Sequence, residues 1–203
     1  MFEEYNKEYF AGGAKISGYD NYENCSGIVR DIFDLTLQAI GNKQDIKSYL
    51  DVGCAYGFAV GRALELGIDA YGIEPPTFAF EQAKQKNWGF RIFEGSLPEL
   101  KPIQRTYDLI TCYEVLEHIP EKDIISAVCK LWELTDKVMC LLPNYNKGNE
   151  STHISCFPRE WWVELFKELD INKYRDIGAE HIFNENIKAK EMLWASRFFV
   201  FKK

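Results

Sequence analysis

Short apolar segments alternate with amphipathic segments along the chain from about residue 45 onward. This alternation is typical of repeated strand–helix–strand units, which build a mostly parallel sheet with helices on both faces. We therefore expect an α/β fold, a Rossmann-like doubly wound sheet that is mostly parallel with an antiparallel last strand. The apolar segments predict strands at residues 48–52, 70–74, 90–93, 107–113 and 137–142, followed by residues 171–177 and 197–201.

Four helices are predicted between these strands. The first begins near Gly57, and the second covers residues 77–87. Apolar residues three and four positions apart predict an amphipathic third helix over residues 120–134. A fourth begins at Pro158, because proline is favoured in the first turn of a helix and the apolar positions after it follow helical spacing.

Residues 1–26 differ from the rest, because tyrosines and a phenylalanine stand among glycines and polar residues without clear periodicity. One interpretation is an aromatic cap over the functional site. The other is an ordered tail packed on the sheet edge, since aromatic residues among glycines also form ordinary packed loops. We see no linker, repeat or low-complexity segment and expect a single domain.

The composition is that of an ordinary folded protein, with 46% apolar and 27% charged residues among 203. The net charge is −7 and no cluster of Lys or Arg offsets it, so nucleic acid is not an expected partner. No apolar stretch approaches the roughly 20 residues that cross a bilayer, so no membrane span is expected. The acidic, aromatic N-terminus lacks the features of a signal peptide, which favours a cytoplasmic location.

Six cysteines could suggest three disulfides, but their placement argues otherwise. Cys112 and Cys140 lie inside apolar, strand-like segments, and no Cys-x-x-Cys pair exists. Buried thiols in a reducing compartment behave as small hydrophobic groups. We therefore expect neither disulfides nor a bound metal.

A glycine-containing turn follows the first predicted strand, in the sequence Leu-Asp-Val-Gly-Cys-Ala-Tyr-Gly that ends at Gly57. Gly53 and Gly57 permit a sharp turn and a close approach to a ligand, and the helix behind them offers unpaired amides to an anion. The second strand ends at Glu74, where a carboxylate can accept hydrogen bonds from both hydroxyls of a ribose. The turn is therefore a candidate nucleotide site.

A dinucleotide is the competing ligand for this turn. The spacing Gly-x-x-x-Gly differs from Gly-x-Gly-x-x-Gly, and Asp51 directly before the loop would repel a pyrophosphate. The Tyr-x-x-x-Lys pair of short-chain dehydrogenases is also absent. S-adenosylmethionine fits better, because its ammonium would meet Asp51, its carboxylate the helix start and its ribose Glu74.

These motifs resemble the class I S-adenosylmethionine-dependent methyltransferases over roughly residues 48–142. The segment at residues 107–120, which contains Tyr-Glu-Val-Leu-Glu-His, is similar to the subgroup that includes the O-methyltransferases of ubiquinone biosynthesis. Ala55 departs from the pattern, since many relatives have glycine there, and is compatible with it if its backbone angles are ordinary. A second departure is the Leu-Thr-Asp sequence before the fifth strand, in place of a Gly-Gly turn.

The resemblance implies which residues bind the cofactor. It divides the chain into the aromatic cap at residues 1–26, a cofactor-binding core at 45–142, and an acceptor side at 143–203. The cofactor-binding residues would be Asp51, Gly53, Cys54, Ala55, Tyr56 and Gly57 on the first turn, Glu74 and Pro75 on the second, Glu94, Gly95, Ser96 and Leu97 beside the adenine, and Tyr113 beside the methyl group.

An acceptor hydroxyl needs a base, and a histidine near its unperturbed pKa suits that task. His118 follows the fourth strand and His153 follows the fifth, so both are expected at the same edge of the sheet, and each is either a base or a structural residue. His181 is the weakest of the three histidines as a candidate.

The expected function is methyl transfer from S-adenosylmethionine to an oxygen or nitrogen of a small molecule or saccharide. Two alternatives remain open: an NAD-dependent oxidoreductase, and a member that binds the cofactor without transferring a methyl group. The sequence does not indicate the acceptor or the oligomeric state.

Overall fold

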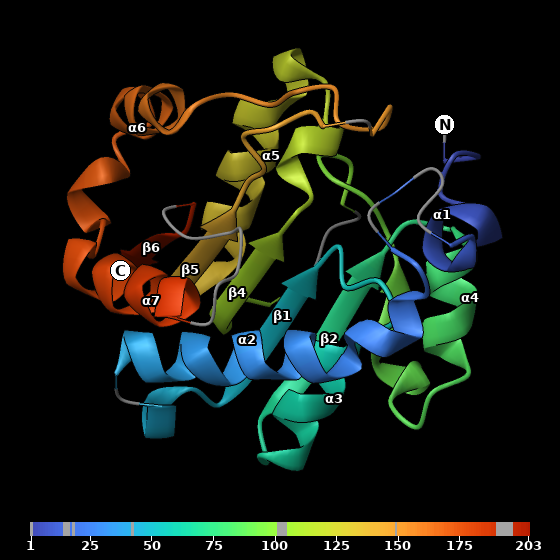
Figure 1. Ribbon diagram of the computed structural model, residues 1–203. Coiled ribbons are helices and arrows are strands. Elements are labelled where there is room, and N and C mark those ends of the chain that lie inside the picture. The colour runs from blue at the N-terminus through green and yellow to red at the C-terminus, as the bar shows by residue number, and fades with distance from the viewer. Residues whose placement is uncertain are drawn as a thin grey trace.

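The computed structural model describes residues 2–13, 17, 19–41, 43–100, 105–148, 150–189 and 197–203. Its centre is a six-stranded sheet in the order β3-β2-β1-β4-β5-β6. Helices cover both faces of this sheet (Figure 1). The strands are β1 (Ser48–Val52), β2 (Asp69–Glu74), β3 (Ile92–Glu94), β4 (Tyr107–Tyr113), β5 (Thr135–Leu142) and β6 (Phe199–Lys202).

The strand directions match the expected doubly wound sheet. β1 pairs in parallel with both β2 and β4, while β6 pairs with β5 in antiparallel orientation. The strand order therefore reverses beside β1, and the carboxyl ends of β1 and β4 diverge there into loops on opposite faces. Ligands of open α/β sheets bind at such a reversal.

Successive side chains of β1 point to opposite faces of the sheet, so this strand contributes residues to two hydrophobic clusters. Leu50 and Val52 point into the cluster formed with α5 (Glu121–Leu134) and α6 (Arg159–Glu168). Tyr49 points into the opposite cluster, formed with α2 (Ser26–Ile40) and α3 (Phe58–Glu65). Because both faces are covered, the central strands consist almost entirely of buried residues. The remaining helices are α1 (Lys7–Ala11), α4 (Phe78–Lys84) and α7 (Ile177–Ala189).

The four predicted helices are present as α3, α4, α5 and α6, but three further helices among the described residues were not predicted. One is α2, which crosses the sheet beside α3 (Figure 1). A second is α1, in the N-terminal segment. The third is α7, which begins inside the segment that was predicted as a strand over residues 171–177. That strand prediction was wrong: a 3₁₀ turn at Asn172–Tyr174 precedes α7, and only Arg175 forms an isolated bridge, to Phe201.

A helix forms here instead of a strand because Asp176, directly before α7, caps the start of the helix. Its carboxylate accepts a hydrogen bond from the amide of Ala179 at 2.9 Å, and its carbonyl accepts one from the amide of Glu180. Such a capping arrangement favours a helix over a strand. Two strands start later than predicted: β3 begins at Ile92, after a 3₁₀ turn at Gly89–Arg91, and β6 begins at Phe199. Two others start slightly earlier, β2 at Asp69 and β5 at Thr135.

The N-terminal segment is more regular than the sequence indicated. It contains α1, whose first amides are capped by the Asn6 side chain, and a 3₁₀ turn at Tyr22–Cys25. The rings of Phe10 and Tyr22 pack against Tyr56 at the glycine-containing turn. In Figure 1, α1 lies beside α4, which follows β2.

No helix among the described residues is both long enough and apolar enough to span a membrane. All six cysteines are unpaired.

Candidate functional site

The turn between β1 and α3 depends on two glycines with positive φ angles. Gly53 has φ of 78° and Gly57 has φ of 72°. A side chain at Gly53 would also overlap the side chain of Val115, which follows β4. The amides of Gly53 and Cys54 both donate to the carbonyl of Ile73, at 2.8 and 3.1 Å, and so tie the turn to β2. The glycines are therefore required by conformation and by space.

Ala55 is strained, contrary to the expectation of ordinary backbone angles. Its φ is 46°, in the left-handed region that residues with a Cβ adopt at a cost. The conformation is held by one hydrogen bond, because the Ala55 amide donates to Glu74 Oε2 at 2.8 Å. Alanine at this position therefore adopts a backbone conformation that is usual for glycine, and the backbone is locally strained.

Glu74 joins the turns after β1 and β2. The side chain is buried, and its Oε1 accepts a 3.3 Å hydrogen bond from the Thr77 hydroxyl, while its Oε2 holds Ala55. Burial, with a smaller contribution from nearby Asp51, raises the pKa of this carboxyl to about 7. Each carboxylate oxygen has two acceptor positions, so one on each remains for a ligand hydroxyl.

Asp51 is a second buried carboxylate beside the turn. Its Oδ1 accepts a 2.7 Å hydrogen bond from the hydroxyl of Thr111, which lies opposite Asp51 on β4. The Thr111 hydroxyl lies 2.6 Å from the hydroxyl of Tyr49. Burial raises the pKa of Asp51 to about 6. Two carboxylates thus lie at the carboxyl ends of β1 and β2.

The other predicted cofactor residues of the first two turns lie around these carboxylates. Cys54 and Tyr56 are buried, and burial raises the pKa of the Cys54 thiol well above its usual value. The Tyr56 carbonyl accepts a 3.0 Å hydrogen bond from the Trp88 indole. Pro75, directly after Glu74, is half-buried.

The third turn follows β3. The amide of Gly95 donates to the carbonyl of Glu74 at 3.0 Å, which places this turn against the second one. Gly95, Ser96 and Leu97 are half-buried, while Glu94 is exposed. The half-buried residues therefore form a partly open edge beside Glu74.

Tyr113, at the end of β4, faces the helical layer formed by α2. Its hydroxyl lies 2.9 Å from the hydroxyl of Thr36, and its ring packs edge-to-face on Phe198. His181 is exposed on α7.

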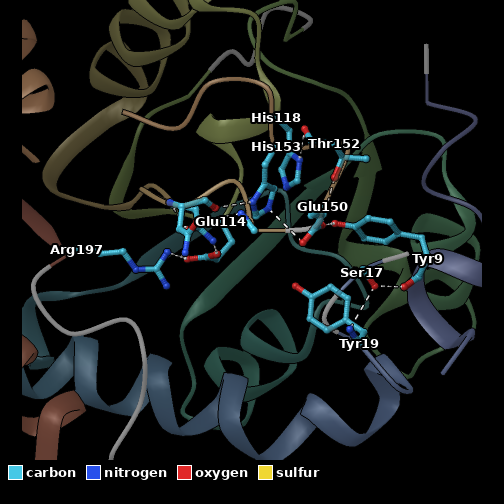
Figure 2. Close-up of polar contacts among 12 residues, drawn as sticks. Tyr9, Ser17, Tyr19, Glu114, His118, Glu150, Thr152, His153 and Arg197 are labelled. Atoms are coloured by element: carbon cyan, nitrogen blue, oxygen red, sulfur yellow. Dashed lines mark hydrogen bonds and ion pairs between the residues drawn. The ribbon is translucent and has the colours of Figure 1, made fainter. Parts of the chain in front are cut away.

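A polar cluster lies where β4 ends, and the sequence reasoning did not identify most of it. Glu114 adopts a left-handed φ of 55°, and its amide donates to the carbonyl of Leu142 at 2.8 Å. Its carboxylate forms an ion pair with Arg197 at 2.9 Å and accepts a 2.7 Å hydrogen bond from Asn144. Figure 2 shows this group beside the two histidines.

Glu117 is fully buried beside Glu114. The backbone amides of Glu117 and Asn144 face it, yet neither carboxylate oxygen has a partner of normal geometry among the described residues. Burial and the nearby charge of Glu114 raise the pKa of Glu117 well above its usual value. The backbone carbonyl of Glu117 accepts hydrogen bonds from the amides of Ile154 and Ser155, both at 2.9 Å, which joins the loops after β4 and β5.

His118 and His153, predicted separately for the same edge of the sheet, lie next to each other (Figure 2). Their ring centroids are 4.8 Å apart. Burial, with a contribution from His153, lowers the pKa of His118 to about 4, so its imidazole is neutral at pH 7. Glu150 lies beside them, with Oε2 3.4 Å from His153 Nε2.

The N-terminal segment contacts this cluster. The Tyr9 hydroxyl donates to Glu150, and the Tyr5 ring packs edge-to-face on His118 at 5.5 Å. The sequence offered one signal for the missed acidic residues, the spacing Glu-x-x-Glu-His at residues 114–118. It offered none for Glu150 or Arg197, which the fold brings in from distant segments.

The family model for a methyltransferase domain matches residues 19–173. The ubiquinone biosynthesis O-methyltransferase of Photobacterium profundum is 38% identical over 92 residues, which cover 41% of this chain and 37% of that protein. The enzyme of the same name from Haemophilus ducreyi is 26% identical over 156 residues, covering 72% and 61%. The matched part is thus less than two thirds of the length of these curated relatives.

Solved structures share the fold at lower identity. The plantazolicin methyltransferase BpumL, crystallised with a pentazolic desmethylPZN analog and SAH, has a TM-score of 0.64 at 14% identity, covering 91% of this chain and 88% of that one. An S-adenosylmethionine-dependent methyltransferase from Clostridium acetobutylicum has a TM-score of 0.52 at 18% identity, covering 62% and 57%. The chain therefore belongs to the methyltransferase domain family, which confirms the resemblance found in the sequence.

Proposed function

We propose that this chain binds S-adenosylmethionine at the turns after β1, β2 and β3 and transfers its methyl group to a small molecule or saccharide. The acceptor atom is an oxygen or a nitrogen. The observation that carries the proposal is the position of Glu74: a buried carboxylate, bonded to the strained Ala55 amide, that keeps acceptor positions for the two hydroxyls of a ribose.

The residues of the site fit this cofactor. Asp51 and Glu74 supply negative charge for an ammonium and hydrogen-bond acceptors for a ribose. The N-cap residue of α3, Gly57, makes no side-chain cap, so the start of that helix can bind a carboxylate. The absence of a Cβ at Gly53 keeps the turn open to close approach, since any side chain there would meet Val115.

S-adenosylmethionine, when bound, supplies a methyl group already activated on a sulfonium. The protein then has to align the acceptor and exclude water, because the displacement is in line. We assign exclusion of water to the aromatic cap, whose residues Phe10 and Tyr22 pack over the glycine-containing turn. An acceptor at the polar cluster would lie among His118, His153 and Glu150, where a neutral imidazole can take its proton.

The test is calorimetric titration of the purified protein with S-adenosylhomocysteine, with NAD as the parallel control. We expect micromolar affinity for the former, about −8 kcal/mol, and no heat from the latter. Asp51→Ala and Gly53→Arg should abolish binding. His153→Ala should retain it and slow turnover.

Two results would contradict the assignment. Unchanged affinity for S-adenosylhomocysteine in the Asp51 and Gly53 variants would show that the cofactor does not bind at this turn. Binding of NAD alone would favour an oxidoreductase.

A further inference from the structure

A groove lies between the outer surfaces of α5 and α6, and none of its lining residues belongs to the candidate site. The two helices lie on the same side of the sheet, opposite α2 and α3 (Figure 1). Their inner faces pack in one hydrophobic cluster, through residues such as Ile124 and Trp162. The groove has a volume of about 750 Å³, within the usual range of binding pockets.

Apolar side chains form the floor of this α5–α6 groove. Ile125 on α5 is 48% exposed, while Leu165 on α6 is buried. Trp161, one turn before Leu165, is half-buried. Its ring stacks on Phe157 with centroids 4.0 Å apart and packs edge-to-face on Trp162 at 5.0 Å. A tryptophan ring fixed in this way beside an exposed isoleucine is typical of the apolar anchors of protein interfaces.

Carboxylates surround this apolar floor. Glu121, Glu164 and Glu168 line the α5–α6 groove, and Lys122 is the only cation among the described residues that do so. Glu164 forms an ion pair with Lys167 at 2.6 Å, whereas Glu121 and Glu168 form none with any residue that the structure describes. The surface is therefore negative, like the chain as a whole with its net charge of −7. Such a surface attracts cationic partners and repels nucleic acid and anionic lipid.

The helices on either side of the groove decide the conformation of the partner. The groove is lined by side chains of α5 and α6 alone, and backbone amides and carbonyls inside a helix already bond to each other. An extended peptide would find no strand edge to pair with. A helix satisfies its own backbone and can place side chains from one face into a groove.

We propose that the α5–α6 groove binds a basic amphipathic helix of another protein. Apolar side chains on one face of that helix would contact Ile125 and Trp161. Lysines or arginines flanking this face would pair with Glu121 and Glu168, at the start of α5 and the end of α6. A second copy of this chain fits less well, because its acidic surface would meet an acidic groove.

The test measures binding of a synthetic helical peptide to the full chain. The peptide has about 14 residues, roughly four turns, with leucines at helical spacing and lysine at every other position. A second peptide keeps the leucines and replaces each lysine by glutamate. Calorimetry at low salt should show one Leu/Lys peptide bound per chain. The Leu/Glu peptide should bind roughly tenfold more weakly or less.

Two variants alter the groove without changing the core. Ile125→Ser removes the exposed apolar anchor. Glu168→Lys reverses a charge at the last residue of α6, where lysine is compatible with a helix. Each should weaken binding of the Leu/Lys peptide roughly fivefold or more. Added salt should weaken binding to the unaltered chain more than binding to Glu168→Lys.

Matched controls lie on α7, away from the groove. Ile182 is 46% exposed, and Glu185, three residues further along, is exposed. Ile182→Ser and Glu185→Lys therefore make the same two changes elsewhere and should bind the Leu/Lys peptide like the unaltered chain. Equal weakening in groove and control variants would indicate general attraction to an acidic surface and overturn the proposal. Absence of peptide binding would overturn it too.

Two further measurements separate this proposal from its alternatives. Light scattering without peptide would overturn it if the chain formed a dimer that Ile125→Ser dissociated, because the occupant would then be a second copy. The groove and control variants should all keep their affinity for S-adenosylhomocysteine, since none lies in the turns assigned to the cofactor. Peptide binding does not depend on that assignment, so either proposal can fail while the other stands.

Discussion

Strained residues gather at the carboxyl ends of the central strands. Ala55 and Glu114 both adopt left-handed backbone, and each is held by a hydrogen bond that links its turn to a neighbouring strand. A left-handed conformation costs a residue with a Cβ roughly 1–2 kcal/mol. Such strain persists where the surrounding structure fixes the backbone, and it is common at functional sites. The strain therefore coincides with the two regions to which we assign cofactor and acceptor.

Replacing Ala55 by glycine should stabilise the protein. The change removes the left-handed penalty of about 1–2 kcal/mol but adds about 0.4–1 kcal/mol of unfolded-state entropy, leaving a net gain of roughly 0.5–1 kcal/mol. Urea unfolding measures it. Ala59→Gly in α3 is the control, and it should lose about 1 kcal/mol because it places a glycine inside a helix. Equal losses in both variants would mean that Ala55 is not strained.

Glu74 should make the unliganded protein less stable as pH rises. Its carboxyl has a pKa of about 7 when folded and 4.5 ordinarily, so the folded chain holds the proton more tightly. The resulting stabilisation is complete below about pH 4.5 and is lost as pH rises through 7. Asp51, with a pKa of about 6, contributes in the same direction.

The variant Glu74→Gln isolates the contribution of Glu74. Between pH 4.5 and pH 8, urea unfolding should show that the unaltered chain loses about 3 kcal/mol more than this variant. Parallel pH profiles of the two proteins would refute the assignment. An affinity for S-adenosylhomocysteine that rises over the same pH range would agree with a ligand that needs the ionised form.

At the scale of elements, the sequence predicts the helices and strands that local patterns determine. It misses those that depend on caps or on contacts with distant segments. Helices α5 and α6 were predicted because their apolar residues repeat three and four apart after a proline. Helix α2 also has a buried apolar face, but it was not predicted. It follows the irregular aromatic segment directly, and no side chain caps its start. Residues 171–177 were assigned the wrong element because the cap at Asp176 outweighed the apolar pattern.

The same distinction holds for the candidate site: some of its features could be predicted from the sequence and others could not. The glycine-containing turn, Glu74 and the two histidines could be placed from strand ends, since parallel strands bring their carboxyl ends to one edge. The pairing of His118 with His153, and the burial of Glu117 beside Glu114, could not. They depend on the bonds from Ile154 and Ser155 to the Glu117 carbonyl, for which no sequence pattern exists.

Helix α1 should depend on the Tyr9 hydroxyl. A helix of five residues is not stable alone, so its contacts must hold it, among them the bond from Tyr9 to Glu150. Tyr9→Phe keeps the ring and removes this bond to a charged group, worth about 1.5–3 kcal/mol. Hydrogen exchange of the α1 amides should become roughly tenfold faster or more. Tyr174→Phe, at a more exposed ring, is the control, and equal exchange rates in both would contradict the role of Tyr9.

At the scale of the whole molecule, the cofactor site we propose lies between the two hydrophobic clusters. Val52, directly before the turn, packs in the cluster with α5. Cys54, within the turn, packs in the opposite cluster with α2 and α3. A ligand at this turn would contact residues supported by both clusters. Its binding should therefore stabilise the entire domain rather than one loop.

Thermal unfolding tests this expectation. S-adenosylhomocysteine at 100 times its Kd adds about 2.7 kcal/mol, which should raise the Tm by about 5–10 °C for a chain of this length. NAD should leave the Tm unchanged. A rise confined to one of two separate transitions would show that the ligand stabilises only part of the chain.

The bond from Tyr9 to Glu150 also sets an order of events during synthesis. Its partners lie 141 residues apart, so the aromatic segment leaves the ribosome long before Glu150 exists. At the usual rate of translation this interval is on the order of ten seconds. Throughout it, the Tyr9 hydroxyl lacks the carboxylate that it binds in the folded protein. Tyr9 is thus made well before it can form this bond, and in the cell this interval is when chaperones have access to it.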